Sequence, residues 1–159
     1  MKRIIAVSLV AAALGAGHAQ AAGSTSGQFN VNITLTSACT LGAVTPVAFA
    51  YTSLQGSAST ATGGGFSVTC TNTLPYTFGL QAGSGAATPP GASTVSVTDN
   101  AVNLGYTLSL SAAGGTGNGS AQSYSVNGTM GSGQAGTCAT ASCTNGSSTN
   151  NVQTLIVNY

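Results

Sequence analysis

Residues 63–70 read Gly63-Gly64-Gly65-Phe66-Ser67-Val68-Thr69-Cys70. Three glycines are followed by a strict alternation of apolar and hydroxyl-bearing side chains, which is typical of a β-strand with one buried face. The glycine run does not fit a phosphate-binding loop, because neither a helix start nor a lysine follows it. This stretch therefore predicts a strand that begins directly after a turn.

The same period of two recurs along the rest of the chain, while helix signals are absent. Glycine is frequent, with 23 residues, and Glu, Lys and Arg are almost missing. Clear alternation marks residues 29–35, 76–80, 104–110 and 155–159, and weaker alternation marks residues 44–51, 94–98 and 123–130. About seven or eight short strands in one domain-sized chain predict an all-β fold, a single antiparallel β-sandwich.

Turn-forming residues separate these runs. We expect Leu74-Pro75 and Asp99-Asn100 to form turns, and Asn127-Gly128 is typical of a tight hairpin turn. Residues 83–91, 112–119 and 131–151 are rich in small and polar residues, so they are predicted loops.

The N-terminus has the pattern of a secretory signal peptide. Lys2 and Arg3 precede an apolar run over residues 4–16, and Ala19-Gln20-Ala21 offers a small-residue cleavage site. The alternative is a retained membrane helix, but the run is short for a bilayer span. We expect residues 1–21 to be removed, with no transmembrane segment in the mature chain, which is exported through the periplasm to the cell surface or secreted.

Four cysteines follow the leader: Cys39, Cys70, Cys138 and Cys143. An even number in an exported chain indicates disulfides, and four cysteines allow three connectivities. We favour Cys39–Cys70 together with Cys138–Cys143, which would staple a surface loop. A zinc site is the rival interpretation, but paired CxxC spacing is missing and no histidine follows the leader.

The residues after the leader carry almost no ionisable chemistry. Lys2, Arg3 and His18 lie within the leader, which leaves Asp99 as the only charged side chain beyond it. We therefore predict no catalytic residue, no metal ligand and no cofactor, because general acids, bases and metal ligands are lacking. A nucleic-acid partner is excluded as well, since no basic side chain remains to contact phosphate. We expect a structural or binding protein rather than an enzyme.

The two ends of the predicted sandwich are unusual. Residues 29–35 form the longest clean alternation, with Phe29, Val31, Ile33 and Leu35 on one face. The last predicted strand presents Leu155, Val157 and Tyr159, with nothing after it to cover its edge. An extended segment of alternating character can add to such an edge. The alternative is that residues 29–35 are simply the first strand of their own sandwich.

The chain also resembles a known family. Residues 61–70 resemble the core stretch of spore coat protein U domains, which include the major pilins of archaic chaperone–usher pili. Residues 26–33 and 37–41, the tyrosine-bearing stretch 104–108 and the ending 154–159 resemble further segments of that family, in the same order. Two departures are Asn150-Asn151-Val152-Gln153, where the family often has a tyrosine–aspartate pair, and the additional Cys138–Cys143 loop.

The resemblance implies an immunoglobulin-like sandwich over residues 37–159 that lacks its last strand. A periplasmic chaperone would lend a strand, and the N-terminal segment of the next subunit would replace it at an outer-membrane usher. Residues 22–36 would be that donor segment, and the family's first disulfide maps onto Cys39 and Cys70.

These observations favour a structural pilin subunit of a surface fibre that supports adhesion or biofilm formation, with identical or related subunits as partners. The alternatives are a spore coat or extracellular matrix protein, and a secreted or tip adhesin module.

Overall fold

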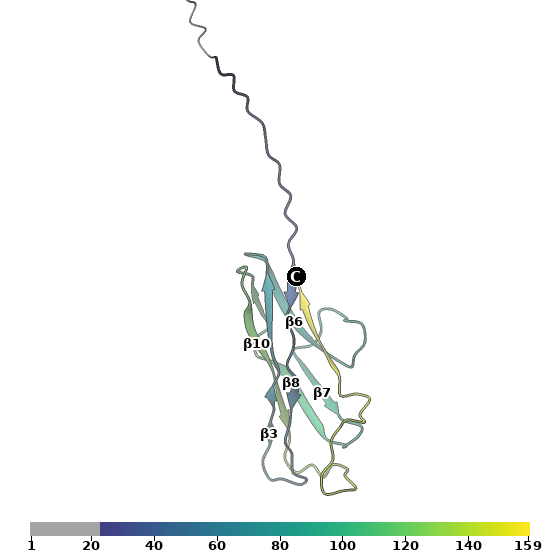
Figure 1. The fold of residues 1–159 in the computed structure, drawn as a ribbon. Helices are drawn as coiled ribbons and strands as arrows, with labels where there is room; N and C mark the ends of the chain where they lie inside the picture. The colour runs from purple at the N-terminus through teal and green to yellow at the C-terminus, as the bar shows by residue number, and fades with distance from the viewer. Residues whose placement is uncertain (1–22) are drawn as a thin grey trace, which may run out of the picture. The chain divides into compact units, whose positions relative to one another are not determined.

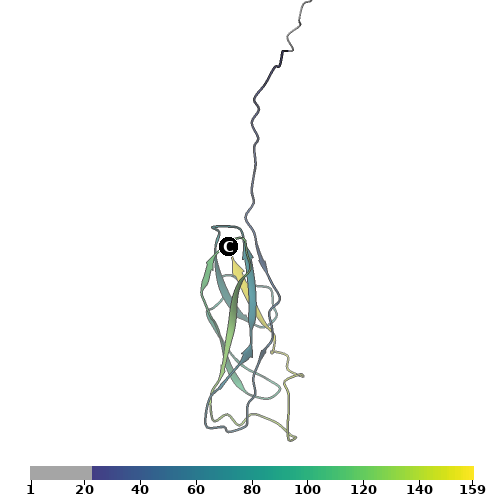
Figure 2. The same cartoon turned by 60° about the vertical axis from the view of Figure 1, so that its left-hand side comes forward.

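The computed structural model describes residues 23–159, so the predicted signal peptide lies outside the described residues. Of the described residues, 23–34 belong to one unit and 35–159 form a second, compact unit. Within the second unit the long strands run lengthwise along the domain (Figure 1, Figure 2). In residues 23–159, no helix has the length and apolar character needed to cross a membrane.

The larger sheet has the strand order β1-β5-β10-β8-β7, and β3 pairs with β10 beside this path. Every pairing is antiparallel. The period-two segments pair because their side chains alternate between a buried and a solvated face. The bounds are β1 (Cys39–Leu41), β3 (Ser59–Thr60), β5 (Gly65–Cys70), β7 (Thr94–Thr98), β8 (Gly105–Leu110) and β10 (Gln122–Met130).

The smaller sheet has the order β11-β6-β9, and β2 pairs separately with β4. Strand β11 is antiparallel to β6 over six residue pairs, from Gln153↔Ala82 to Asn158↔Thr77. The bounds are β2 (Val47–Ala48), β4 (Thr62–Gly63), β6 (Pro75–Ala82), β9 (Gly114–Thr116) and β11 (Gln153–Asn158). The all-β fold that the sequence predicts is confirmed, and antiparallel sheets packed around one core are compatible with an immunoglobulin-like sandwich.

The core lies between the inward faces of the two sheets. Strand β5 contributes Phe66 and Val68 to it, and β6 contributes Tyr76, Phe78 and Leu80. The rings of Phe66 and Phe78 meet edge to face at 5.2 Å between centroids, a favourable arrangement for aromatic pairs.

Tyr76 and Tyr124 bring a polar contact into this aromatic core. Their hydroxyl groups lie 2.7 Å apart, which satisfies both polar atoms. Burial, together with this hydrogen bond, raises the pKa of Tyr76 to about 12. Tyr76 is therefore a neutral hydrogen-bonding group of the core at physiological pH.

Most strand predictions are confirmed, and three local predictions are wrong. Asn127-Gly128 is not a hairpin turn but lies inside β10, opposite Ser109 and Leu108 of β8. A side chain at Gly128 would collide with the Phe49 ring, so the glycine permits a close approach rather than a turn. The predicted loop 112–119 contains β9, and the predicted strand 44–51 is reduced to β2.

Candidate functional site

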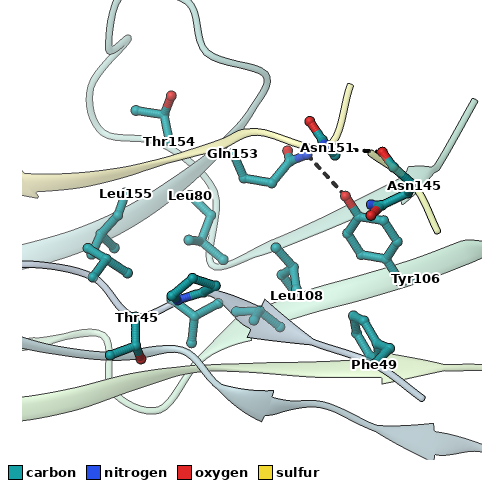
Figure 3. Close-up of a pocket in the computed structure, with 14 residues that line it drawn as sticks. Thr45, Phe49, Leu80, Tyr106, Leu108, Asn145, Asn151, Gln153, Thr154 and Leu155 are labelled. Atoms are coloured by element: carbon teal, nitrogen blue, oxygen red, sulfur yellow. Dashed lines mark hydrogen bonds between the residues drawn. The ribbon is translucent and has the colours of Figure 1, made fainter. Parts of the chain in front are cut away.

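An open groove runs between residues 44–49 and strand β11 (Figure 3). It encloses about 320 Å³, and Leu80, Leu108 and Val126 line it from β6, β8 and β10. Strand β11 pairs with β6 only, and β2 pairs with β4 only, so no ladder within residues 23–159 joins the two sides. The sandwich therefore carries an apolar hollow between two strips of backbone that are not paired with each other.

Strand β11 forms one wall of this groove. Leu155 and Val157 pack against the core but remain half-buried, whereas Ile156 on the opposite face is buried. Ile156 lies beside the backbone of Gly91, in the loop that follows β6. Tyr159 lies beyond β11 and is 64% exposed. The inward face of β11 thus lacks the cover that its outward face has.

Several hydrogen-bonded polar side chains interrupt the apolar lining of the groove. Gln153 donates a hydrogen bond from Nε2 to the Tyr106 hydroxyl at 3.1 Å, and Asn151 donates to the backbone oxygen of Asn145 at 3.3 Å (Figure 3). Burial raises the pKa of Tyr106, and the nearby Asp99 charge adds to this, while the Gln153 hydrogen bond opposes it. These side chains hold their places through mutual hydrogen bonds.

A second hollow of about 350 Å³ adjoins the groove. The two hollows share Val47, Phe49, Tyr106 and Asn145. Together they follow the chain from residue 44 to residue 51. These eight positions are at least as many as the five or six residues of a typical β-strand.

Asp99 lies in the wall of the second hollow and is only 2% exposed. Its Oδ1 accepts hydrogen bonds from the backbone amides of Ala101 (2.9 Å) and Val102 (3.1 Å), and its Oδ2 accepts one from Asn145 Nδ2 (3.1 Å). Burial alone would raise the pKa of this carboxyl, but the hydrogen bonds outweigh it and lower the pKa. The sequence predicted the turn at Asp99 but not the burial of its side chain. The available signal was that Asp99 is the only charged side chain in residues 23–159.

The N-terminal segment carries apolar side chains that are complementary in character to the apolar groove. Residues 23–38 form no strand. Four apolar side chains at alternate positions are exposed: Phe29 (86%), Val31 (72%), Ile33 (85%) and Leu35 (79%).

The family model of the Spore Coat Protein U domain matches residues 25–155. The chain belongs to this family. The match confirms the resemblance seen in the sequence and spans residues 29–35 as well as both sides of the groove. Neither the curated proteins nor the solved structures gave a match to the chain. The family associates the domain with chaperone–usher pili and spore coats, which are structural assemblies.

This Spore Coat Protein U domain has two disulfides, in the pairing that the sequence favoured. Cys39–Cys70 joins β1 to β5 next to the core, and Cys138–Cys143 closes an exposed loop. Residues 23–159 hold no group of three or more His, Cys, Asp or Glu side chains that could bind a metal ion. The groove is apolar and bounded by backbone that is not paired across it, so its chemistry suits a β-strand.

Proposed function

We propose that this Spore Coat Protein U domain is a structural pilin subunit that polymerises by donor-strand exchange. The observation that carries the proposal is that the same chain has both an open, strand-length groove and an exposed segment of alternating apolar residues. In the fibre, residues 29–35 of one copy lie in the groove of the next. A contact of this head-to-tail kind repeats without closing, which produces a fibre.

The energetics require both side chains and backbone. Burying an apolar side chain of this size contributes about 1.5–3 kcal/mol. Ordering each residue of the segment costs about 1–2 kcal/mol of backbone entropy. Burial of Phe29, Val31, Ile33 and Leu35 therefore roughly balances the ordering of seven residues. Hydrogen bonds to the free edge of β11 and to residues 44–49 then favour the bound strand.

In this proposal, residues 1–21 are a signal peptide, residues 22–36 are the donor segment and residues 37–159 form the incomplete sandwich. A periplasmic chaperone covers the groove until assembly at an outer-membrane usher. The fibre is displayed on the cell surface and supports adhesion or biofilm formation.

The test places a charge on either face of the donor segment. Val31→Asp puts a carboxylate into the apolar groove, where burial costs several kcal/mol, so we expect fibres to be lost. Asn32→Asp introduces the same charge at the neighbouring position on the opposite face, and fibres should form normally. Both variants are compared with the parent by negative-stain electron microscopy of the cell surface.

Fibres of normal length from Val31→Asp would contradict donor-strand exchange. Equal loss from both variants would point to a general effect of charge instead. If the parent strain shows no thin fibres but a layer that depends on this protein, the coat or matrix function replaces the pilin.

A further inference from the structure

Asn145 occupies a junction between the groove and the buried carboxylate. Its side chain donates from Nδ2 to Asp99 Oδ2 at 3.1 Å, and the residue lines both hollows of the groove. Its backbone oxygen accepts hydrogen bonds from Asn151 Nδ2 at 3.3 Å and from the Ser148 N–H at 2.9 Å. A chemical change at Asn145 therefore reaches the turn at Asp99 and the wall of the groove together.

Asn145 is followed by Gly146, and this dipeptide has a well-defined reactivity. The backbone nitrogen of the glycine attacks Cγ of the asparagine, loses its proton and expels ammonia, which closes a succinimide ring. Water then opens the ring to aspartate or isoaspartate. Glycine favours the reaction because it has no side chain to hinder ring closure, and the reaction requires a glycine N–H that is free to move.

Residues 23–159 contain three Asn-Gly dipeptides, and the other two are restrained. Gly119 donates its N–H to the Cys70 carbonyl at 3.1 Å, and the Asn118 side chain accepts from Ser120 at 2.9 Å. Asn127-Gly128 lies within the paired strand β10. Gly146, by contrast, is exposed and its N–H makes no hydrogen bond to the part of the chain that the structure describes.

We propose that Asn145 is a site of spontaneous deamidation, and that its conversion to an acid releases the loop that walls the groove. The reaction replaces a donor to Asp99 with a second carboxylate at hydrogen-bond distance. Two carboxylates so close do not both remain ionised without a large cost. The other titratable groups that line this hollow are Tyr51 and Tyr106, and no cation is present to compensate.

The consequence for assembly rests on the proposed function. Release of the loop displaces Asn145 and Asn151 from the groove wall, so an aged subunit accepts a donor strand less well. The extent of deamidation at Asn145 therefore distinguishes newly made subunits from old ones.

The first experiment measures the modification directly. The purified protein is held at mildly alkaline pH, digested with pepsin and followed by mass spectrometry; pepsin is chosen because no Lys or Arg follows the leader. We expect deamidation at Asn145 to be several-fold faster than at Asn118, and Asn127 to react slowest. A rate at Asn145 no greater than that at Asn118 would overturn the proposal.

The second experiment measures the effect. Asn145→Asp should lower the melting temperature at neutral pH, and the loss should shrink in acid, where the two carboxyls share a proton. The matched control Asn118→Asp should melt like the parent at both pH values. Equal melting of Asn145→Asp and the parent would refute release of the loop.

Neither readout depends on fibres. Fibre yield of Asn145→Asp, measured by electron microscopy, then tests the consequence for assembly separately. If Val31→Asp still formed normal fibres and so contradicted donor-strand exchange, the deamidation and melting results would be unaffected.

Discussion

The stability of this protein in acid should depend on one side chain. Asp99 is the only acidic side chain in the sequence, and it is buried and hydrogen-bonded. Its folded-state pKa lies below the ordinary value of 3.8. The contribution of Asp99 is therefore complete above the unfolded-state pKa, and it is lost as the pH falls through the folded-state pKa.

The magnitude follows from the number of protons involved. A single group changes the free energy of unfolding by at most about 1.4 kcal/mol per pH unit. Hydrogen bonds to a charged group contribute about 1.5–3 kcal/mol, and Asp99 is too buried for solvent to screen them. We expect stability to be constant near neutral pH and to fall with no more than this slope once the pH drops below 3.8.

The assay is urea unfolding at a fixed protein concentration, followed by circular dichroism over a series of pH values. Asp99→Asn keeps the shape but removes the charge, and its new amide nitrogen faces the donor of Asn145. This variant should lose about 1.5–3 kcal/mol at neutral pH and show no acid-dependent loss below it. A parent whose stability does not fall in acid, or a variant that falls as steeply as the parent, would refute the reasoning.

Two further predictions concern packing and cross-links. Gly79→Ala should destabilise the protein by about 1–3 kcal/mol, because the new methyl group would collide with the Pro90 carbonyl oxygen, while Gly56→Ala, which meets open space, should be neutral in thermal melts. Replacing Cys138 and Cys143 together by alanine should cost about 2 kcal/mol in urea unfolding. Loss of the Cys39–Cys70 disulfide between β1 and β5 should cost more, roughly 3.7 kcal/mol, because Cys39–Cys70 closes a longer loop than Cys138–Cys143. An equal cost for the two disulfides would contradict the chain-entropy argument.

The sequence predicted the strands whose alternating pattern lies within one short segment. Alternation at Phe66 and Val68, and again at Tyr76, Phe78 and Leu80, predicted strands that the structure shows with those side chains in the core. A period of two is visible within one segment, so it needs no knowledge of the neighbouring strands.

It failed where a distant contact decides the conformation. Asn127-Gly128 carries a turn signal, yet it lies in β10 because β8 pairs with it and the Phe49 ring requires a residue without a side chain. Residues 44–51 alternate like a strand but pair only at Val47–Ala48. Local propensity is a weak preference that tertiary pairing overrides.

By itself, then, the sequence determined an all-β chain with Asp99 as the one charged side chain in residues 22–159, an even set of cysteines and a segment of alternating apolar residues at 29–35. Only the tertiary structure decided that residues 44–49 and 151–155, about a hundred positions apart in the chain, face each other across an unpaired groove. It also decided that Asp99 is buried against Asn145. The reason is physical: alternation fixes which face of a strand is apolar, whereas the pairing of strands depends on contacts between segments that no local pattern encodes.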